Sequence, residues 1–224
     1  MGLSIAWNQI DIIMFDMDGT LLDLAFDNFF WREVVVRAWA TAQDVPHDHA
    51  LNHLGPIFKQ FEGSLNWYSL PFWSEQLKLD LQALKLEHRE RISIRMGVQA
   101  LLETLRQQGK ILWLVTNAHP QALEIKLEKT GIASYFQHIF SSHDHGYAKE
   151  QAEFWQSLQR DAYFDPKRCI LIDDSEPVLH AAHAFGLHVV GIEQPDSTLP
   201  ARQNLHFPAI SMWSELTHGL DQES

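Results

Sequence analysis

The sequence predicts an α/β fold, in which helices wrap a parallel β-sheet and a helical segment is inserted after the first strand. Two observations support this prediction. Short apolar runs alternate with helical patterns over most of the 224 residues, an order that is typical of parallel sheets. One long stretch, residues 24–95, carries amphipathic helical patterns and no convincing strand. The first observation predicts the sheet, and the second predicts the insertion.

Five apolar runs predict the strands. Short runs of this kind, bounded by turn residues, are consistent with buried strands of a parallel sheet. The third run is weaker than the others. In chain order, the predicted strands are residues 11–15, 111–115, 139–141, 169–172 and 188–192.

Helical patterns separate these strands, and Pro and Gly mark their ends. Pro120 and Pro177 stand in expected first turns, and Gly109, Gly131 and Gly186 follow expected last turns. Pro fits a first turn because its missing N–H is not needed there, and Gly readily adopts the left-handed conformation that often ends a helix. The predicted helices are residues 98–108, 120–130, 150–160 and 176–185.

Residues 24–95 are predicted to form a separate helical cap that is rich in aromatic side chains. A crossover between parallel strands needs about a dozen residues, and this stretch is far longer. The alternative is an oversized crossover that belongs to the main domain. We therefore expect a core formed by residues 1–23 and 96–224, with residues 24–95 as the cap. The tail after Pro195 is poorly patterned and is expected to wind over the surface.

The composition argues against some classes of function. The net charge is −12, from 29 acidic and 17 basic residues, so the surface repels polyanions and nucleic acid is not expected as a partner. An anionic small-molecule substrate is compatible with this charge if its site is locally positive. The chain lacks the ~18 consecutive apolar residues of a membrane span, and residues 1–10 make a poor signal peptide. Cys169 is the only cysteine, which excludes an internal disulfide and fits a reducing cytosol. A cytoplasmic protein without membrane attachment is therefore expected.

Reactive side chains are expected beyond the carboxyl ends of the strands, where ligands of open parallel sheets bind. The first predicted strand is followed by the motif DMDGT, which contains Asp16 and Asp18. Two carboxylates in this spacing can divide a reaction, because one attacks as a nucleophile while the other moves a proton. The alternative is a turn with capping acids. The preceding apolar strand and the continuation Gly-Thr-Leu-Leu favour the chemical interpretation.

Thr116 and Asn117 follow the second predicted strand, and Lys149 follows the third. A hydroxyl, an amide and the free N–H groups of a helix start can hold a phosphate, and a lysine can offset its charge. Taken singly, each residue has a plainer explanation, because Thr and Asn often cap helices and most lysines lie on the surface. Their common position after strands favours a joint role.

Asp173 and Asp174 follow the fourth predicted strand. Placing these acids near Asp16 and Asp18 is unfavourable unless a cation joins them. Carboxylate ligands suit Mg²⁺, which also binds substrate phosphate. Helix capping is a compatible role for an acid at this position, but it does not explain why acids end both strands. A Mg²⁺ site is therefore expected.

These four motifs resemble those of the haloacid dehalogenase-like hydrolases. The segments occur in the order of that family, and the resemblance covers essentially the whole chain, including the helical insertion: DMDGT, TN, Lys149 and IDDS. The resemblance implies a Rossmann-like core with an inserted cap. One departure is that Glu150 follows Lys149, where Pro is common in the family, and this leaves the pose of the lysine open.

The resemblance also implies a Mg²⁺-dependent phosphatase reaction and a role for each motif residue. Asp16 is the implied nucleophile, and Asp18 is the implied general acid and then base. Thr116 and Lys149 are implied to hold the phosphoryl group, beside Asn117. The implied Mg²⁺ ligands are the Asp16 carboxylate, the Asp18 backbone carbonyl and Asp174, with Asp173 in or beside that shell.

Several segments look more narrowly like the bacterial purine 5′-nucleotidases that dephosphorylate GMP and IMP: LLDLAFDNFFW, LNWYSLPFWSEQLKLDL, TNAHP and IDDSE. The implied substrate is a small phosphomonoester, a purine nucleoside monophosphate. Purines stack on aromatic rings by about 1–3 kcal/mol per base, so Trp67, Tyr68 or Trp73 is a candidate platform. The alternative is that these rings pack the core of the cap. His119 is either a substrate contact or a polar residue near a helix start.

Other activities are compatible with parts of the pattern. A dehalogenase of the same fold needs neither the second aspartate nor Mg²⁺, and it is disfavoured because Asp18 and Asp174 are present. A phosphatase for sugar phosphates has the same core motifs and stays open. A phosphate-binding protein without turnover is disfavoured because all four motif positions hold competent residues. The sequence does not predict the oligomeric state.

Overall fold

The computed structural model describes residues 5–217 and contains, within that range, a six-stranded parallel sheet. The strand order is β3-β2-β1-β4-β5-β6, and neighbouring strands pair in parallel. The strands are β1 (Ile12–Phe15), β2 (Ile111–Thr116), β3 (His138–Ser141), β4 (Cys169–Asp173), β5 (His188–Ile192) and β6 (Ala209–Ile210). The predicted α/β fold with a Rossmann-like sheet is confirmed.

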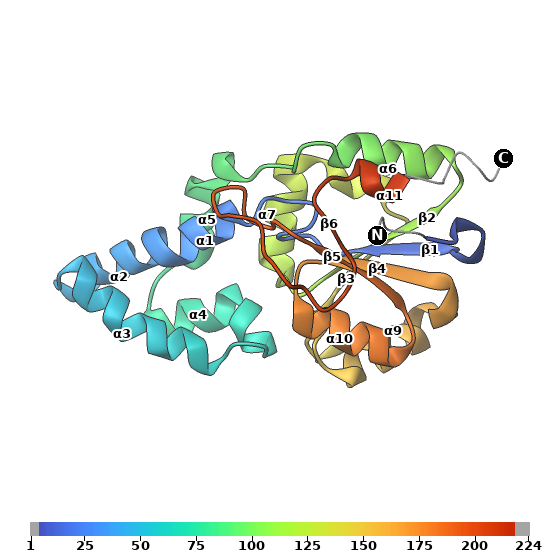
Figure 1. Cartoon of the computed structure of the whole chain (residues 1–224). Coiled ribbons are helices and arrows are strands. Elements are labelled where there is room, and N and C mark those ends of the chain that lie inside the picture. The colour runs from blue at the N-terminus through green and yellow to red at the C-terminus, as the bar shows by residue number, and fades with distance from the viewer. Residues whose placement is uncertain (1–4, 218–224) are drawn as a thin grey trace.

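Helices cover both faces of the sheet (Figure 1). Because side chains alternate along a strand, Ile13 and Phe15 of β1 face one side, and Ile12 and Met14 face the other. The first side packs against α6, α7 and α11, and the second against α9 and α10. The helices of the core are α6 (Val98–Gln107), α7 (Pro120–Thr130), α8 (Ser142–His145), α9 (Ala152–Ala162), α10 (Glu176–Phe185) and α11 (Ser214–Thr217). Within residues 5–217, no helix combines the length and the apolar character needed to cross a membrane.

The chain between β1 and α6 forms a helical lobe to one side of the sheet, drawn in blue to green in Figure 1. Its connections to the core lie side by side, because Leu22 and Ile94 form a β-bridge and Arg95 N–H donates to the Leu21 carbonyl oxygen at 3.0 Å. This pairing supports a cap over residues 24–95, whose boundaries stay a prediction. The elements of the lobe are α1 (Ala25–Phe29), a π-helical turn (Phe30–Val34), α2 (Val35–Gln43), α3 (His47–Gln60), a 3₁₀ turn (Leu65–Tyr68), α4 (Leu70–Leu77), α5 (Leu81–Glu87) and a second 3₁₀ turn (Arg89–Arg91).

Aromatic side chains form the centre of this lobe. Trp73 is 1% exposed, and its ring packs edge-on against Phe58, Phe61 and Phe72 at centroid distances of 4.9, 5.3 and 5.0 Å. Its Nε1 donates to the Trp67 carbonyl oxygen at 3.0 Å, so the indole is both packed and hydrogen-bonded, as buried Trp side chains usually are. Trp73 therefore belongs to the core of the lobe, in agreement with the alternative interpretation, and is not accessible to a base.

Several strand ends differ from the prediction by one residue, and the short helix α8 is not predicted. Two further differences concern the tail and the helix after Lys149. The tail after Pro195 forms β6 and α11, which the sequence pattern does not predict. β6 has only two residues, which are too few to show an alternating pattern. In the structure, Gly191 N–H of β5 donates at 2.7 Å to a carbonyl oxygen in the loop just before β6. The helix expected from residue 150 begins at Ala152, because Gln151 N–H donates to the Ala148 carbonyl oxygen at 2.9 Å and closes a turn first.

Candidate active site

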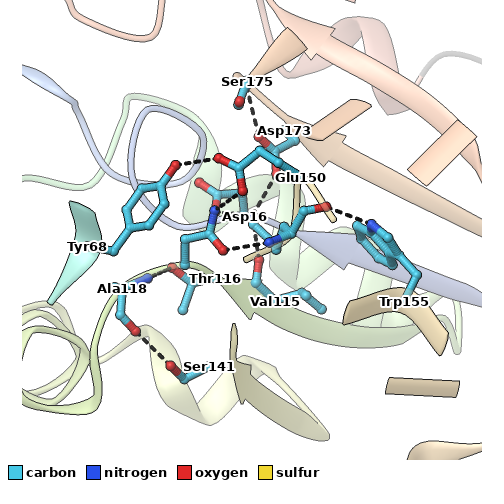
Figure 2. Close-up of polar contacts among 12 residues, drawn as sticks. Asp16, Tyr68, Val115, Thr116, Ala118, Ser141, Glu150, Trp155, Asp173 and Ser175 are labelled. Carbon is cyan, nitrogen blue, oxygen red and sulfur yellow. Dashed lines mark hydrogen bonds and ion pairs between the residues drawn. The ribbon is translucent and has the colours of Figure 1, made fainter. Parts of the chain in front are cut away.

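The predicted site residues meet at the carboxyl edge of the sheet. β1 lies between β2 and β4, so residues that follow these three strands are neighbours in space. Asp16 comes directly after β1, Thr116 is the last residue of β2, and Asp173 is the last residue of β4. The order of the strands reverses between β1 and β4, and ligands of open α/β sheets bind at such a switch point. Figure 2 shows these side chains converging around Asp16.

Lys149 lies at the centre of the site. Its side chain is 1% exposed, and Nζ lies 2.5 Å from Asp16 Oδ1 and 2.7 Å from Asp173 Oδ2. Its backbone is also held on both sides, because its N–H donates to Asn117 Oδ1 at 2.9 Å and its carbonyl oxygen accepts from Trp155 Nε1 at 2.8 Å. These contacts fix the pose of the lysine, which the sequence leaves open.

Three carboxylates are close enough to share one cation. Asp16, Asp173 and Asp174 each offer an oxygen atom, and these atoms lie within 4.8 Å of one another. Gly19 permits this arrangement, because a Cβ atom there would lie 2.6 Å from Asp174 Cγ and because its φ of +84° favours glycine. The glycine of DMDGT therefore lets the loop after β1 pack against the loop after β4.

The carboxylates repel one another, and those of Asp16 and Asp173 are buried. Burial raises the pKa of Asp16 well above its usual value; Lys149 opposes this shift, and three neighbouring carboxylates add to it. Burial, followed by the charge of Asp173, raises the pKa of Asp174 to about 7. A divalent cation would reverse these shifts because it favours ionised carboxylates. This set of hard oxygen donors fits Mg²⁺.

The two acids at the end of β4 have different partners. Asp173 Oδ2 accepts from Lys149 Nζ at 2.7 Å, and its Oδ1 accepts from the Ser175 N–H at 2.9 Å. Both oxygens of Asp173 are therefore engaged by the protein, whereas Asp174 is half-buried against Gly19. This difference favours Asp174 as the acid that meets a metal, with Asp173 orienting the lysine.

Thr116 ends β2 and Asn117 follows it, so the strand extends one residue beyond its predicted end. Thr116 is buried and its Oγ1 accepts from the Ala118 N–H at 3.0 Å, which leaves the hydroxyl hydrogen for a ligand. Both ends of the Asn117 amide are engaged, because Oδ1 accepts from the Lys149 N–H and Nδ2 donates to Glu150 Oε2 at 2.9 Å. Asn117 therefore holds the lysine loop.

Glu150 joins the core to the cap. Its Oε1 accepts from the Tyr68 hydroxyl at 2.6 Å, as Figure 2 shows. Burial, followed by the charge of Glu150, raises the pKa of Tyr68 well above its usual value, so the phenol stays protonated and donates. The sequence marks Glu150 as a departure from the family pattern but does not reveal this partner.

Two other candidates have plainer roles. Trp67 is half-buried and packs against the hydrophobic core. His119 caps α7, where its Nδ1 accepts from the Gln121 N–H at 3.3 Å, and its ring lies 4.8 Å from that of His143. This position agrees with the alternative stated for His119, a polar residue near a helix start.

A further group of charged residues, not expected from the sequence, surrounds Asp18. Lys126 Nζ forms ion pairs with Asp18 Oδ1 at 2.6 Å and with Asp27 Oδ2 at 2.7 Å, and Lys85 Nζ lies 2.7 Å from Asp27 Oδ1. We call Lys126, Asp27 and Lys85 the junction triad, because Asp27 and Lys85 come from the cap and Lys126 from the core. The sequence signal that could have revealed the burial of Lys126 is its spacing. It lies three residues after the buried Leu123, on the same face of α7.

Known proteins with similar sequences identify the family. Residues 10–186 match the family model of the haloacid dehalogenase-like hydrolases. The chain belongs to this family. It is therefore a hydrolase, and the resemblance stated from the four motifs is confirmed.

Curated members of the family include two nucleotidases. The GMP/IMP nucleotidase YrfG of Escherichia coli (strain K12) is 38% identical over 221 residues, which cover 98% of this chain and 100% of the relative. The pyrimidine 5′-nucleotidase YjjG of the same organism is 25% identical over 179 residues, which cover 74% of this chain and 77% of the relative. The first likeness extends through the cap as well as the core.

Solved structures of haloacid dehalogenase-like proteins share the fold. A HAD phosphatase from Thermococcus onnurineus superposes with a TM-score of 0.78 at 21% identity, covering 93% of this chain and 97% of that one. The putative HAD-hydrolase YfnB from Bacillus subtilis, bound to magnesium, superposes with a TM-score of 0.63 at 21% identity, covering 95% and 99%. At 21% identity, the similarity to these two structures supports the fold alone.

Proposed function

We propose that this hydrolase is a Mg²⁺-dependent phosphatase that transfers the phosphoryl group of a small phosphomonoester to Asp16 and then to water. The observation that carries the proposal is the meeting of Asp16, Lys149 and Asp174 at one point of the sheet edge. A nucleophile, a fixed cation and a set of metal-binding oxygens are the parts that phosphoryl transfer requires.

The chain's own residues account for the binding of the phosphate. Lys149 supplies a positive charge, and the Thr116 hydroxyl and the backbone at Asn117 supply hydrogen-bond donors. Mg²⁺ would be held by the Asp16 carboxylate, the Asp18 carbonyl and Asp174. When bound, it would neutralise charge on the phosphate and on the carboxylates.

The reaction divides into two steps. In the first, Asp16 forms a bond to phosphorus while the bond to the leaving oxygen breaks, and Asp18 gives that oxygen a proton. In the second, Asp18 takes a proton from water, whose oxygen attacks the aspartyl phosphate and releases phosphate and free Asp16. Two easier steps replace one difficult step, and the protein contributes mainly position and charge.

We infer further that the substrate is a purine nucleoside monophosphate. The support is the identity of 38% to the GMP/IMP nucleotidase over the whole length of that protein, against 25% to the pyrimidine nucleotidase. The cap is the part of the fold placed to select the leaving group, because Tyr68 of the cap reaches Glu150 at the edge of the site. Closure of the cap would exclude bulk water during the reaction.

A substrate panel tests this proposal. The purified protein would be assayed for phosphate release with GMP, IMP, AMP, a pyrimidine nucleotide and two hexose phosphates, with Mg²⁺ and after removal of metal. We expect kcat/KM to be highest for GMP and IMP and to vanish reversibly without the metal. A preference for hexose phosphates would reject the purine assignment, and release of phosphate without divalent metal would reject the proposed site.

A further inference from the structure

The junction triad brings a second buried lysine to the other acid of DMDGT. Lys126 extends from α7, and its side chain is 2% exposed. Nζ lies 2.6 Å from Asp18 Oδ1 on one side and 2.7 Å from Asp27 Oδ2 on the other. Asp27 is held in turn by Lys85 from α5, whose side chain is also 2% exposed. Asp18 is thereby connected, through Lys126, to two helices of the cap.

Stability alone is a weak explanation for this arrangement. Removing charges from water is costly, and a buried ion pair is often replaced by apolar side chains with no loss of stability. Asp27 and Lys85 already neutralise one another at 2.7 Å. Lys126 adds a further buried charge, and the carboxylate that it meets in the core is Asp18. Its position therefore relates to what Asp18 does.

We propose that Lys126 is a positioning residue for Asp18 and that Asp27 of the cap fixes Lys126. The inference rests on the proposed function, in which Asp18 is the acid and base of the reaction. Asp18 Oδ1 is buried against Lys126, whereas the Asp18 side chain as a whole is 22% exposed. The ion pair thus fixes the rotation of the carboxylate and leaves Oδ2 as the oxygen that exchanges the proton.

This orientation serves both steps of the reaction. In the first step, the proton passes from Oδ2 to the leaving oxygen as its bond to phosphorus breaks, and Asp18 becomes ionised. In the second step, Oδ2 takes a proton from the attacking water, so Asp18 returns to its starting state. Oδ2 faces the reacting atoms in both steps, because Lys126 stays paired with Oδ1. Since the anchor of Lys126 lies in the cap, this position is set at the junction of cap and core.

The test compares two substrates whose leaving groups differ in their need for a proton. The ribose oxygen of GMP leaves as an alkoxide unless an acid protonates it, whereas the phenolate of para-nitrophenyl phosphate leaves readily without a proton. Rapid quenching of the first turnover, with Mg²⁺ and substrate saturating, separates phosphorylation of Asp16 from the hydrolysis that both substrates share. In Lys126→Met, we expect the phosphorylation rate to fall by about 10²-fold with GMP and by less than about threefold with the aryl phosphate, because general acid catalysis contributes about 10²–10⁴-fold.

A matched control distinguishes positioning from general damage. Lys85→Met removes the other buried lysine of the triad, by the same change of side chain and at the same exposure of 2%, but it leaves the contact of Lys126 with Asp18. We expect this variant to slow both substrates alike. Asp27→Asn keeps the size of the side chain and weakens the anchor of Lys126 together with the ion pair to Lys85. Because the Lys85→Met variant reports the loss of that second pair, Asp27→Asn is expected to slow GMP about tenfold more than the aryl phosphate.

The outcomes distinguish failure of the proposed function from failure of the role proposed for Lys126. A wild-type protein that hydrolyses neither substrate with Mg²⁺ would reject the proposed function itself. An active wild type in which Lys126→Met slows both substrates equally, or in which Lys85→Met gives the same difference between substrates, would overturn the role of Lys126 alone. If circular dichroism shows that Lys126→Met does not fold, Asp27→Asn decides by the same comparison, and equal slowing of both substrates overturns the role.

Discussion

Two buried lysines each bridge a pair of aspartates, and each pair includes one acid of the DMDGT motif. The pairs are Asp16 with Asp173 at Lys149, and Asp18 with Asp27 at Lys126. All four contacts measure 2.5–2.7 Å, and both lysines are 1–2% exposed. The two aspartates of the motif therefore stand in similar local geometry, although their proposed roles differ.

The two lysine sites differ in their balance of charge. Asp174 adds a third carboxylate beside Lys149, with oxygen atoms of the three acids within 4.8 Å of one another. At Lys126, the second lysine of the triad, Lys85, compensates Asp27. The first site has an excess of negative charge that suits a divalent cation and its phosphate ligand, whereas the second is neutral within the protein. We infer that the Lys149 site binds the cation and the phosphate, whereas the Lys126 site positions Asp18.

The largest effect is expected at the nucleophile. Asp16→Asn removes the attacking oxygen but keeps the size of the side chain, and Lys149 retains Asp173, so the protein is expected to fold. Turnover should fall by at least about 10⁴-fold, as is usual when a nucleophile is replaced. Steady-state phosphate release, with circular dichroism as the control for folding, measures this. Substantial activity in a folded Asp16→Asn variant would show that Asp16 is not the nucleophile. The Lys149 site would then have no chemical role that distinguishes it from the Lys126 site.

A smaller effect is expected at Asp174, the third carboxylate beside Lys149. Asp174→Asn should raise the Mg²⁺ concentration for half-maximal activity by more than about tenfold, since even residues that only support a metal ligand typically contribute 10–100-fold. Activity titrated with Mg²⁺ gives this value. Asp48→Asn, at an acid whose side chain is 97% exposed, is the matched control and should leave the midpoint unchanged. An unchanged midpoint in Asp174→Asn would place the metal elsewhere.

The pH dependence of stability should also differ between Asp174 of the Lys149 site and Asp27 of the Lys126 site. The pKa of Asp174 is raised to about 7, so its contribution to stability is complete at acidic pH and is lost as pH rises through about 7. For metal-free protein between pH 6 and 8, this amounts to about 1 kcal/mol of unfolding free energy. Burial would raise the pKa of Asp27, but the charges of Lys126 and Lys85 outweigh burial and lower it, so the contribution of Asp27 is constant over that range.

Urea unfolding at pH 6 and pH 8 measures this difference. Comparing wild type with Asp174→Asn cancels the opposite contribution of His143, whose pKa burial lowers to about 4. We expect the wild type to lose more stability than the variant on going to pH 8, and saturating Mg²⁺ to abolish the difference. An equal loss in both proteins would contradict the excess charge assigned to the Lys149 site.

The smallest effect is expected where the Lys149 loop meets the cap. Tyr68→Phe removes the hydroxyl that donates to Glu150 at 2.6 Å and leaves Lys149 itself in place. A single hydrogen bond contributes about 1 kcal/mol, so kcat/KM for GMP should fall by only a few-fold, far less than in Lys126→Met. A loss as large as that of Lys126→Met would show that the cap acts through Glu150 rather than through the junction triad.

The sequence predicts the sheet and the Lys149 site well because their signals are local. Each apolar run marks a strand, and parallel strands bring their carboxyl ends together, so Asp16 and Asp173 are expected to be neighbours from their positions. Lys149 is expected beside them only from the four motifs taken together, because α8 separates it from β3. β6 is missed because two residues carry no pattern.

The junction triad is missed for a different reason. Lys85 and Lys126 stand in amphipathic helical patterns, where a lysine usually points to solvent. Their shared partner, Asp27, lies 58 and 99 residues away in the chain, and only the packing of the cap against α7 brings them together. No local pattern reports how one domain packs on another, and this contact sets the surroundings of Asp18.

The most direct test of the proposed reaction is to trap its covalent intermediate. The protein would be mixed with Mg²⁺ and GMP, quenched in acid within the first turnover, digested and examined by mass spectrometry. A phosphoryl group on Asp16, lost on further incubation before the quench and missing in Asp16→Asn, is the expected result. A first turnover that releases guanosine and phosphate together, with Asp16 unmodified throughout, would contradict the assignment of this residue as the nucleophile.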